Sequence, residues 1–211
     1  MSDSYGGRVA NNELVLLDQV LQARQAERSA PLPDDTAFEL FACEQATVVP
    51  DIITLSKALT GGTLPLAATV ARRPVFDSFW SDDSDKALMH GPTYMGNPLA
   101  CAAANASLDL FEREPRLAQV AAIGRQMTEE LAPCRGLRGV KDVRVKGAIG
   151  VVEMERIGDL AALRARFVEE GVFVRPFGNI IYLTPSFTIA PDELSRLTSA
   201  IVKVVGQGRA A

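Results

Sequence analysis

The sequence of 211 residues predicts a mixed α/β fold, and three observations favour it. Short apolar runs alternate with Ala- and Leu-rich stretches from residue 38 onward, as strands alternate with helices in such folds. Helix-start signals, Asn97-Pro98 and Pro191-Asp192-Glu193, stand directly before two of these stretches. Hydrophobic residues form 47% of the chain and charged residues 23%, the balance of a globular protein with a buried core.

Residues 1–36 differ in pattern from the rest and are expected to form a separate leader. Apolar residues recur at helical spacing over residues 12–27, which predicts a helix. A segment rich in proline and aspartate follows at residues 29–35 and is typical of a linker.

Residues 37–132 are expected to form the first α/β domain. The apolar run at residues 48–55 predicts a buried strand, with Pro50 at or before its start because proline cannot donate a backbone hydrogen bond. Asn97 and Pro98 predict the start of a helix over residues 98–112. The other elements expected here are a strand at 66–70, a short helix at 74–80, an acidic loop at 81–86 and a helix at 115–131.

Residues 133–211 are expected to form a small α/β domain with a sheet of its own. Gly171 predicts the end of a helix over residues 159–170. Acidic residues after Pro191 predict the start of a last helix that runs to about residue 205. The expected strands lie at residues 140–145, 148–153, 172–175 and 180–184.

Composition excludes several classes of function. The net charge is −4 and no block of basic residues occurs, so nucleic acid and anionic membranes are not expected as partners. No apolar run approaches membrane-spanning length and the first residues lack signal-peptide character, so we expect a cytoplasmic protein. The three cysteines are widely spaced and there is a single histidine, so no metal site is expected.

Lys57 stands between an apolar run and the glycine pair Gly61-Gly62. A lysine at the end of a strand can lie at the mouth of a pocket, where partial desolvation lowers the pKa of an ammonium and makes the amine a nucleophile. Schiff-base formation with a carbonyl compound or with pyridoxal phosphate requires such an amine. The alternative is a solvated loop lysine beside glycines.

Residues 90–101 form a second candidate segment. Gly91 allows a ligand to approach the backbone closely, and Thr93 offers a hydroxyl and an amide to a phosphate. A turn that caps a helix explains residues 96–98 equally well. It does not explain the Gly91-Pro92-Thr93 sequence.

Residues 175–182 form the third candidate segment. Arg175 beside a glycine turn can present its guanidinium fork to a carboxylate, and Tyr182 adds a hydroxyl nearby. The alternative is a surface arginine and a half-buried tyrosine.

Taken together, these segments resemble the class III pyridoxal-phosphate aminotransferases. The resemblance covers about four fifths of the chain, and its motifs occur in the family's order. It implies a fold-type I pyridoxal-phosphate-dependent transferase, with a partial large domain at 37–132 and a C-terminal small α/β domain at 133–211. The residues that carry it are 40–44, 56–62, 90–101, 147–153 and 175–182.

The resemblance also implies a role for each candidate residue. Lys57 matches the lysine that holds the cofactor covalently and later moves a proton. Pro92 and Thr93 match the residues that bind the cofactor phosphate, in this family across a dimer interface, and Gly91 lies where substrate is contacted. Arg175 matches the arginine that binds the substrate carboxylate, and Tyr182 lies on the substrate side.

Within the family, the motifs are most similar to the branch of biotin biosynthesis that uses S-adenosylmethionine as amino donor and 8-amino-7-oxononanoate as acceptor, giving 7,8-diaminononanoate. Family members are considerably longer than this chain. The part that usually precedes residue 40 carries the aspartate that pairs with the pyridine nitrogen of the cofactor, and Asp34 and Asp35 are poor substitutes. We therefore expect either a homodimer or a partner that supplies the missing half of the large domain.

Two other functions remain open on sequence grounds. The chain could be a non-catalytic remnant or assembly subunit that keeps an association surface. It could also be another class III aminotransferase acting on ω-amino acids or ornithine. The sequences His90-Gly91-Pro92-Thr93 and Arg175-Pro176-Phe177-Gly178 argue against this alternative.

Overall fold

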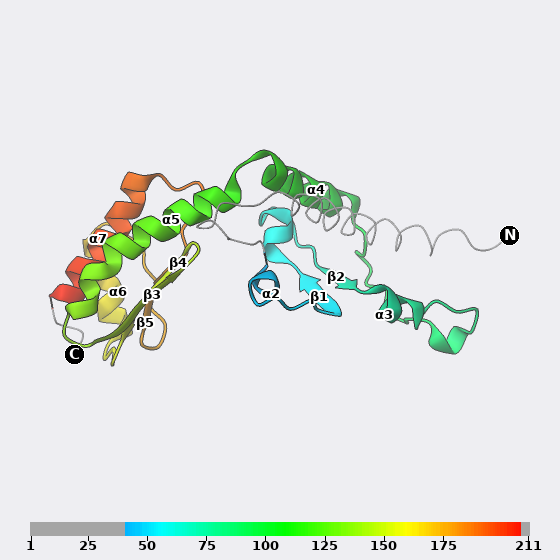
Figure 1. The fold of residues 1–211 in the computed structure, drawn as a ribbon, viewed down its shortest axis with the longest axis horizontal. Helices are drawn as coiled ribbons and strands as arrows, with labels where there is room; N and C mark the ends of the chain where they lie inside the picture. The colour runs from blue at the N-terminus through cyan, green and yellow to red at the C-terminus, as the bar shows by residue number, and fades with distance from the viewer. Residues whose placement is uncertain (1–40, 208–211) are drawn as a thin grey trace. The chain divides into compact units, whose positions relative to one another are not determined.

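The computed structural model describes residues 41–207 (Figure 1). These residues fall into two compact units, residues 41–114 and residues 115–207. The expected leader at residues 1–36, its helix at 12–27, and both Asp34 and Asp35 lie outside the described residues.

The first unit contains a two-stranded antiparallel sheet, β1 (Ile52–Leu55) and β2 (Ala68–Ala71), in which Ile52 faces Ala71 and Leu55 faces Ala68. A short 3₁₀ helix, η1 (Lys57–Thr60), follows β1 after one residue and packs against the long helix α4 (Pro98–Arg113). The remaining elements of this unit are α2 (Ala42–Gln45), α3 (Arg73–Asp77) and η2 (Ser84–Lys86).

Helix α4 starts where the sequence predicts it. The Asn97 side chain accepts hydrogen bonds from the amides of Leu99 and Ala100 at 3.0 and 3.2 Å, and Pro98 occupies the first turn. The helix therefore satisfies two of its free N-terminal amides without a partner from another element.

The strand expected at residues 48–55 differs from β1 in length and in burial. Pairing with β2 begins only at Ile52, after Pro50, and the Val49 and Ile52 side chains are 79% and 53% exposed. The expectation of a buried strand was wrong for this structure. Burial needs layers on both faces of a sheet, and β1 pairs only with β2 among the described residues.

The second unit is a three-stranded antiparallel sheet covered by helices. Its strands, in spatial order, are β3 (Val140–Lys146), β4 (Ile149–Met154) and β5 (Ile180–Leu183). Helix α5 (Arg116–Leu131) packs against β3 and β4, α7 (Pro191–Gly206) packs on α5, and α6 (Leu160–Glu169) packs on α7 (Figure 1). The 3₁₀ helix η3 (Ala132–Gly136) connects α5 to the sheet.

The core of this unit lies between the sheet and the helices. Alternate residues of β4, Gly150, Val152 and Met154, are buried, as the two-residue period of a strand requires. Met127 and Leu131 of α5 are fully buried against them. The helix that we assigned to the first domain, residues 115–131, thus packs in the second compact unit.

Residues 172–175, which we expected to form a strand, have no ladder of strand hydrogen bonds. Val174 and Pro176 are nevertheless buried. Pro176 lacks an amide hydrogen and cannot donate a strand hydrogen bond. The first paired residue after this segment is Phe177, which forms an isolated bridge with Ile180. The strand prediction was therefore wrong, although the segment does contribute to the core.

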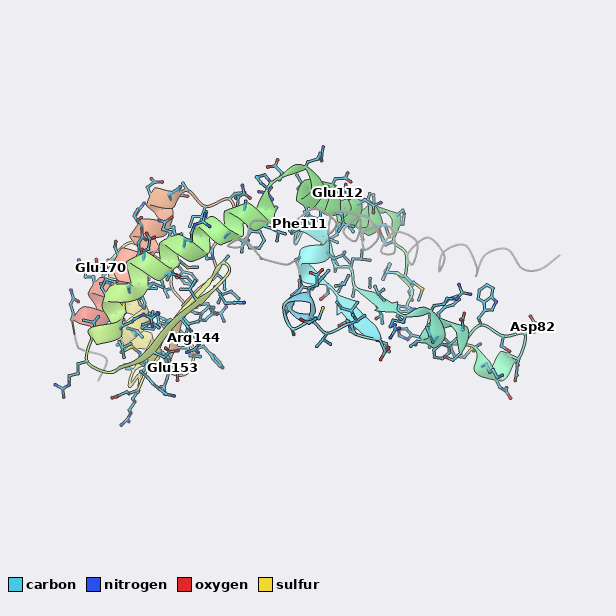
Figure 2. The ribbon with its side chains drawn as sticks, viewed as in Figure 1. Asp82, Phe111, Glu112, Arg144, Glu153 and Glu170 are labelled. Atoms are coloured by element: carbon cyan, nitrogen blue, oxygen red, sulfur yellow. The ribbon has the colours of Figure 1, made fainter. Side chains whose placement is uncertain are left out.

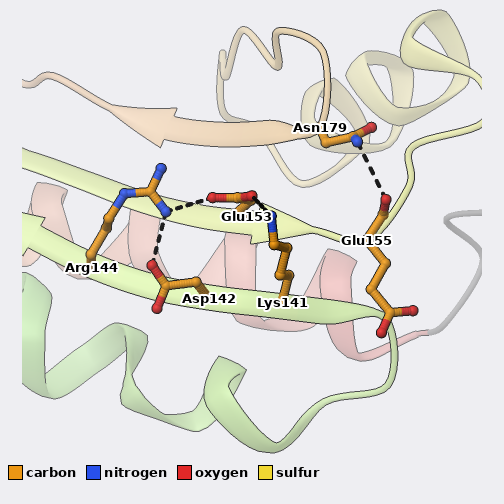
Figure 3. A network of polar contacts seen from close by, with 6 residues as sticks. All are labelled: Lys141, Asp142, Arg144, Glu153, Glu155 and Asn179. Atoms are coloured by element: carbon orange, nitrogen blue, oxygen red, sulfur yellow. Dashed lines mark hydrogen bonds and ion pairs between the residues drawn. The ribbon is translucent and has the colours of Figure 1, made fainter.

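Ion pairs join the side chains of β3 and β4 on the surface of the sheet. Glu153 of β4 forms ion pairs with Lys141 and Arg144 of β3, each at 2.7 Å, and Arg144 also pairs with Asp142 at 2.8 Å (Figure 3). These hydrogen bonds hold the pKa of Glu153 below its usual value. Glu170, labelled in Figure 2, lies just after α6. It pairs with Lys203 of α7 at 2.7 Å.

Candidate functional site

Lys57 is the first residue of η1 and follows β1 after the single residue Ser56. Its backbone φ is 53°, in the left-handed region that residues other than glycine seldom occupy. Its side chain is exposed, and the amine has no hydrogen-bond or ion-pair partner in the described part of the chain. The structure thus presents an unpaired amine on a strained backbone, a combination associated with functional sites.

The turn after Lys57 is closed by its own backbone. Gly61 and Gly62 have φ values of 60° and 78°, and their amides donate to the carbonyls of Ala58 and Lys57 at 3.0 and 3.3 Å. Glycine suits both positions because it lacks the Cβ that makes a positive φ costly.

Thr60, which the sequence analysis did not single out, is the residue of this turn that is buried. Its hydroxyl donates to the Leu64 carbonyl at 2.6 Å, and its own carbonyl accepts from the Thr63 hydroxyl at 2.8 Å. Ser107 of α4 donates to the Ala58 carbonyl at 3.3 Å. The sequence carried no signal for these roles beyond the presence of hydroxyl residues near glycines.

Gly91, Pro92 and Thr93 lie in an exposed segment just before α4. The Pro92 carbonyl accepts from the Met95 amide at 2.9 Å, and Gly96 has a φ of 65°. This turn leads directly into the cap of α4. Because the body of α4 packs against η1, the same helix supports the Lys57 turn and follows the Gly91-Pro92-Thr93 segment.

Arg175 and Tyr182 lie in the second unit, on either side of a tight turn. Phe177 and Ile180 exchange two backbone hydrogen bonds of 2.9 Å across this turn, where Gly178 has a φ of 53°. Arg175 is exposed and its guanidinium has no partner among residues 41–207. Tyr182 is half-buried on β5, opposite Val151 of β4.

The candidate residues therefore divide between the units. Lys57, Gly91, Pro92 and Thr93 belong to the first, and Arg175 and Tyr182 to the second. Among the residues that the structure describes, no three His, Cys, Asp or Glu side chains gather as metal ligands would. Over the same residues, no helix combines the length and apolar character needed to cross a membrane.

A comparison with known families decides what these segments belong to. The sequence profile described as "Aminotransferase class-III" matches residues 37–205, which include every candidate residue. The chain belongs to the class III aminotransferases. The match confirms the resemblance seen in the sequence. Enzymes of this family depend on pyridoxal phosphate.

Several curated aminotransferases are similar to this chain. The adenosylmethionine-8-amino-7-oxononanoate aminotransferase of Buchnera aphidicola subsp. Acyrthosiphon pisum is 46% identical over 163 residues, which are 77% of this chain and 38% of the relative. The protein of the same name from Mycobacterium leprae is 44% identical over 80% of this chain and 38% of its own.

Solved structures of aminotransferases share the fold. The adenosylmethionine-8-amino-7-oxononanoate aminotransferase of Methanocaldococcus jannaschii superposes with a TM-score of 0.72 at 30% identity, covering 81% of this chain and 43% of its own. An amine transaminase from an uncultivated Pseudomonas species gives a TM-score of 0.72 at 32% identity, covering 80% and 41%. The chain is thus a mixed α/β part of this fold, and spans about two fifths of the relatives' length.

Proposed function

We propose that this chain carries the lysine-bearing part of the large domain and the C-terminal small domain of a fold-type I aminotransferase. The reaction is transfer of an amino group from S-adenosylmethionine to 8-amino-7-oxononanoate, which gives 7,8-diaminononanoate in biotin biosynthesis. The observation that carries the proposal is the unpaired amine of Lys57, held on a left-handed turn that packs on α4.

The residues present fit pyridoxal phosphate. An exposed, unpaired amine suits an aldehyde, and an exposed threonine before a helix suits a phosphate. When bound, this cofactor supplies an electron sink that stabilises negative charge on the substrate carbon. Lys57 Nζ would hold the cofactor and, once released, carry a proton to and from that carbon.

The other candidate residues take positioning roles in this proposal. Pro92 and Thr93 would hold the phosphate, and Gly91 would leave room for substrate beside it. The guanidinium of Arg175 is exposed and has no partner among residues 41–207. It would bind the substrate carboxylate through two parallel hydrogen bonds. Tyr182, on strand β5, would contact the same substrate.

Activity in this proposal requires polypeptide beyond these residues. The matched relatives are more than twice as long as the segment that aligns with this chain. The residue that pairs with the pyridine nitrogen is also unassigned among residues 41–207. We propose that a second copy, or polypeptide supplying the rest of the large domain, completes the site in the cytoplasm.

The test is capture of pyridoxal phosphate by the full chain, with borohydride reduction and peptide mass spectrometry. We expect the reduced pyridoxyl group on Lys57, and its loss in Lys57→Ala. Lys86→Ala, which removes an exposed lysine of η2, is the matched control and should leave capture at Lys57 unchanged. Equal labelling of Lys57 and Lys86 in the unmodified chain would contradict a cofactor site.

A second candidate is another class III activity, because an amine transaminase resembles this chain as closely in fold as a protein of the biotin branch does. Half-reactions with S-adenosylmethionine, ornithine and ω-amino acids, measured on chain that captures the cofactor, distinguish the two. A third candidate, a non-catalytic assembly subunit, predicts no capture at Lys57 and no half-reaction with any donor.

A further inference from the structure

Thr60 is the only buried polar side chain among the residues of 41–114 whose burial is described, at 2% exposure. Its neighbours in the turn, from Lys57 to Thr63, are half-buried or exposed. A buried hydroxyl must be hydrogen-bonded to avoid the cost of its desolvation. The Thr60 hydroxyl meets this requirement by donating to the Leu64 carbonyl at 2.6 Å.

The hydrogen bonds of Thr60 close the loop that contains the glycine pair. Its side chain reaches forward to Leu64, while its carbonyl accepts from the Thr63 hydroxyl at 2.8 Å and from the Thr63 amide at 3.2 Å. Gly61 and Gly62, which have wide conformational freedom, are thereby held between fixed ends.

Helix α4 forms the wall behind this turn. Ala100 and Ala104 of α4 are buried, Ser107 follows on the same helix face, and α4 packs against η1. Ser107 also donates to the Ala58 carbonyl at 3.3 Å, and its oxygen lies 3.9 Å from where a Cβ on Gly61 would stand.

The strained residue in this frame is Lys57. A left-handed backbone at a lysine persists only where surrounding contacts fix it. Three hydroxyls add to the backbone hydrogen bonds of the 57–64 turn: Thr60 donates to the Leu64 carbonyl, Thr63 to the Thr60 carbonyl and Ser107 to the Ala58 carbonyl. Of these three residues, Thr60 is the buried one.

We propose that Thr60, assisted by Ser107, is a positioning residue for Lys57. Its buried hydroxyl holds the turn so that the Lys57 backbone keeps its left-handed conformation and the amine keeps one direction. This inference rests on the proposed function, in which the Lys57 amine is the reacting group.

The first test is amide hydrogen exchange in the full chain without cofactor. Thr60→Val keeps the shape but removes the hydroxyl, and the amides of Gly61 and Gly62 should exchange about five- to tenfold faster. Thr60→Ser restores the donor and should restore slow exchange. Thr69→Val, at an exposed position of β2, is the matched control and should change nothing in the turn.

The second test is reductive capture of pyridoxal phosphate at Lys57 relative to Lys86. Thr60→Val should lower this ratio about five- to tenfold and alter its pH profile, with Thr60→Ser close to the unmodified chain. If Thr60→Val also accelerates exchange throughout α4, the unit is unfolding. Ser107→Ala then serves as the milder variant, with an expected effect of about two- to threefold at the same amides.

The outcomes separate the two ideas. Capture at Lys57 in the unmodified chain, with exchange and capture both unchanged in Thr60→Val and Ser107→Ala, would overturn the positioning role and leave the proposed function standing. Failure of the unmodified chain to favour Lys57 over Lys86 would refute the proposed function, and the positioning role with it.

Discussion

Glu130 joins two helices of the second unit through its carboxylate. It accepts from Ser195 and Thr198 of α7 and from Gln126 of α5, at 2.6, 2.5 and 3.0 Å. Burial alone would raise the pKa of Glu130, but these three hydrogen bonds outweigh it and hold the pKa below its usual value of 4.5. The ionised carboxylate is therefore the form that links α5 to α7.

This linkage predicts a pH-dependent stability. A carboxyl whose pKa is lowered by folding stabilises the native state above its unfolded pKa, and the effect is lost as pH falls through the native pKa. Glu130→Gln should lower the free energy of unfolding by about 1–2 kcal/mol at neutral pH. The difference should shrink below pH 4.5. Urea unfolding at several pH values measures it, and an equal difference at all pH values would contradict the assignment.

Gly124 lets α5 approach the turn between β3 and β4. A Cβ at this position would stand 2.9 Å from the carbonyl oxygen of Gly147, which is backbone and cannot rotate away. Gly124→Ala should therefore destabilise the second unit by about 1–3 kcal/mol. Gly136→Ala is the control, since a Cβ there meets nothing within 4 Å. Thermal unfolding compares the two, and equal melting temperatures would refute the packing argument.

At the scale of elements, α4 depends on its cap. Asn97→Ala removes the acceptor for the Leu99 and Ala100 amides and should cost about 1 kcal/mol in the first unit. Asn105→Ala, at an exposed position within α4, is the matched control and should be neutral or slightly stabilising, because alanine is the better helix former. Hydrogen exchange of the α4 amides distinguishes the variants, and similar rates in both would contradict the cap.

Sequence signals located elements well where the local chemistry was sufficient. Asn97-Pro98 marked the start of α4, and Gly171, with a φ of 75°, marks the end of the α6 region. Strands were less secure, because a strand exists only with a partner. The sequence of Val48 and Val49 is typical of a strand, but both residues precede Ile52, where the pairing of β1 with β2 begins. Residues 172–175 form no strand hydrogen bonds, although Val174 is buried.

At the scale of the whole molecule, the first unit exposes much apolar surface. Trp80, Met89 and Tyr94 are 61%, 92% and 80% exposed. Exposed apolar area of this kind marks an interaction surface or a tendency to aggregate. The described sheet of this unit also has only two strands, so each keeps an unpaired edge.

This surface predicts association. The isolated chain should self-associate, or become stable only with polypeptide that covers the apolar side chains. Light scattering with size-exclusion chromatography measures it, over a range of salt concentrations that separates apolar from ionic association. A stable, monodisperse monomer would contradict the prediction.

The candidate site could be predicted from the sequence only in its parts. Lys57, Thr93 and Arg175 were identified because the glycines and prolines beside them mark turns in the sequence. Thr60 was missed because its importance depends on burial against α4, which no local pattern encodes. The relation of Lys57 to Arg175 depends on how two separate units meet, which local sequence chemistry does not specify.

The three thiols also divide between the units. Cys43 and Cys101 are half-buried in the first unit, whereas Cys134 is fully buried in the second, where burial raises the pKa of its thiol to about 11. Alkylation of Cys134 consequently requires the C-terminal core to open, while the other two react from the native state. Timed alkylation of Cys134 thus reports the opening of the C-terminal core without an added label, whereas Cys43 and Cys101 mark the first unit in its native state.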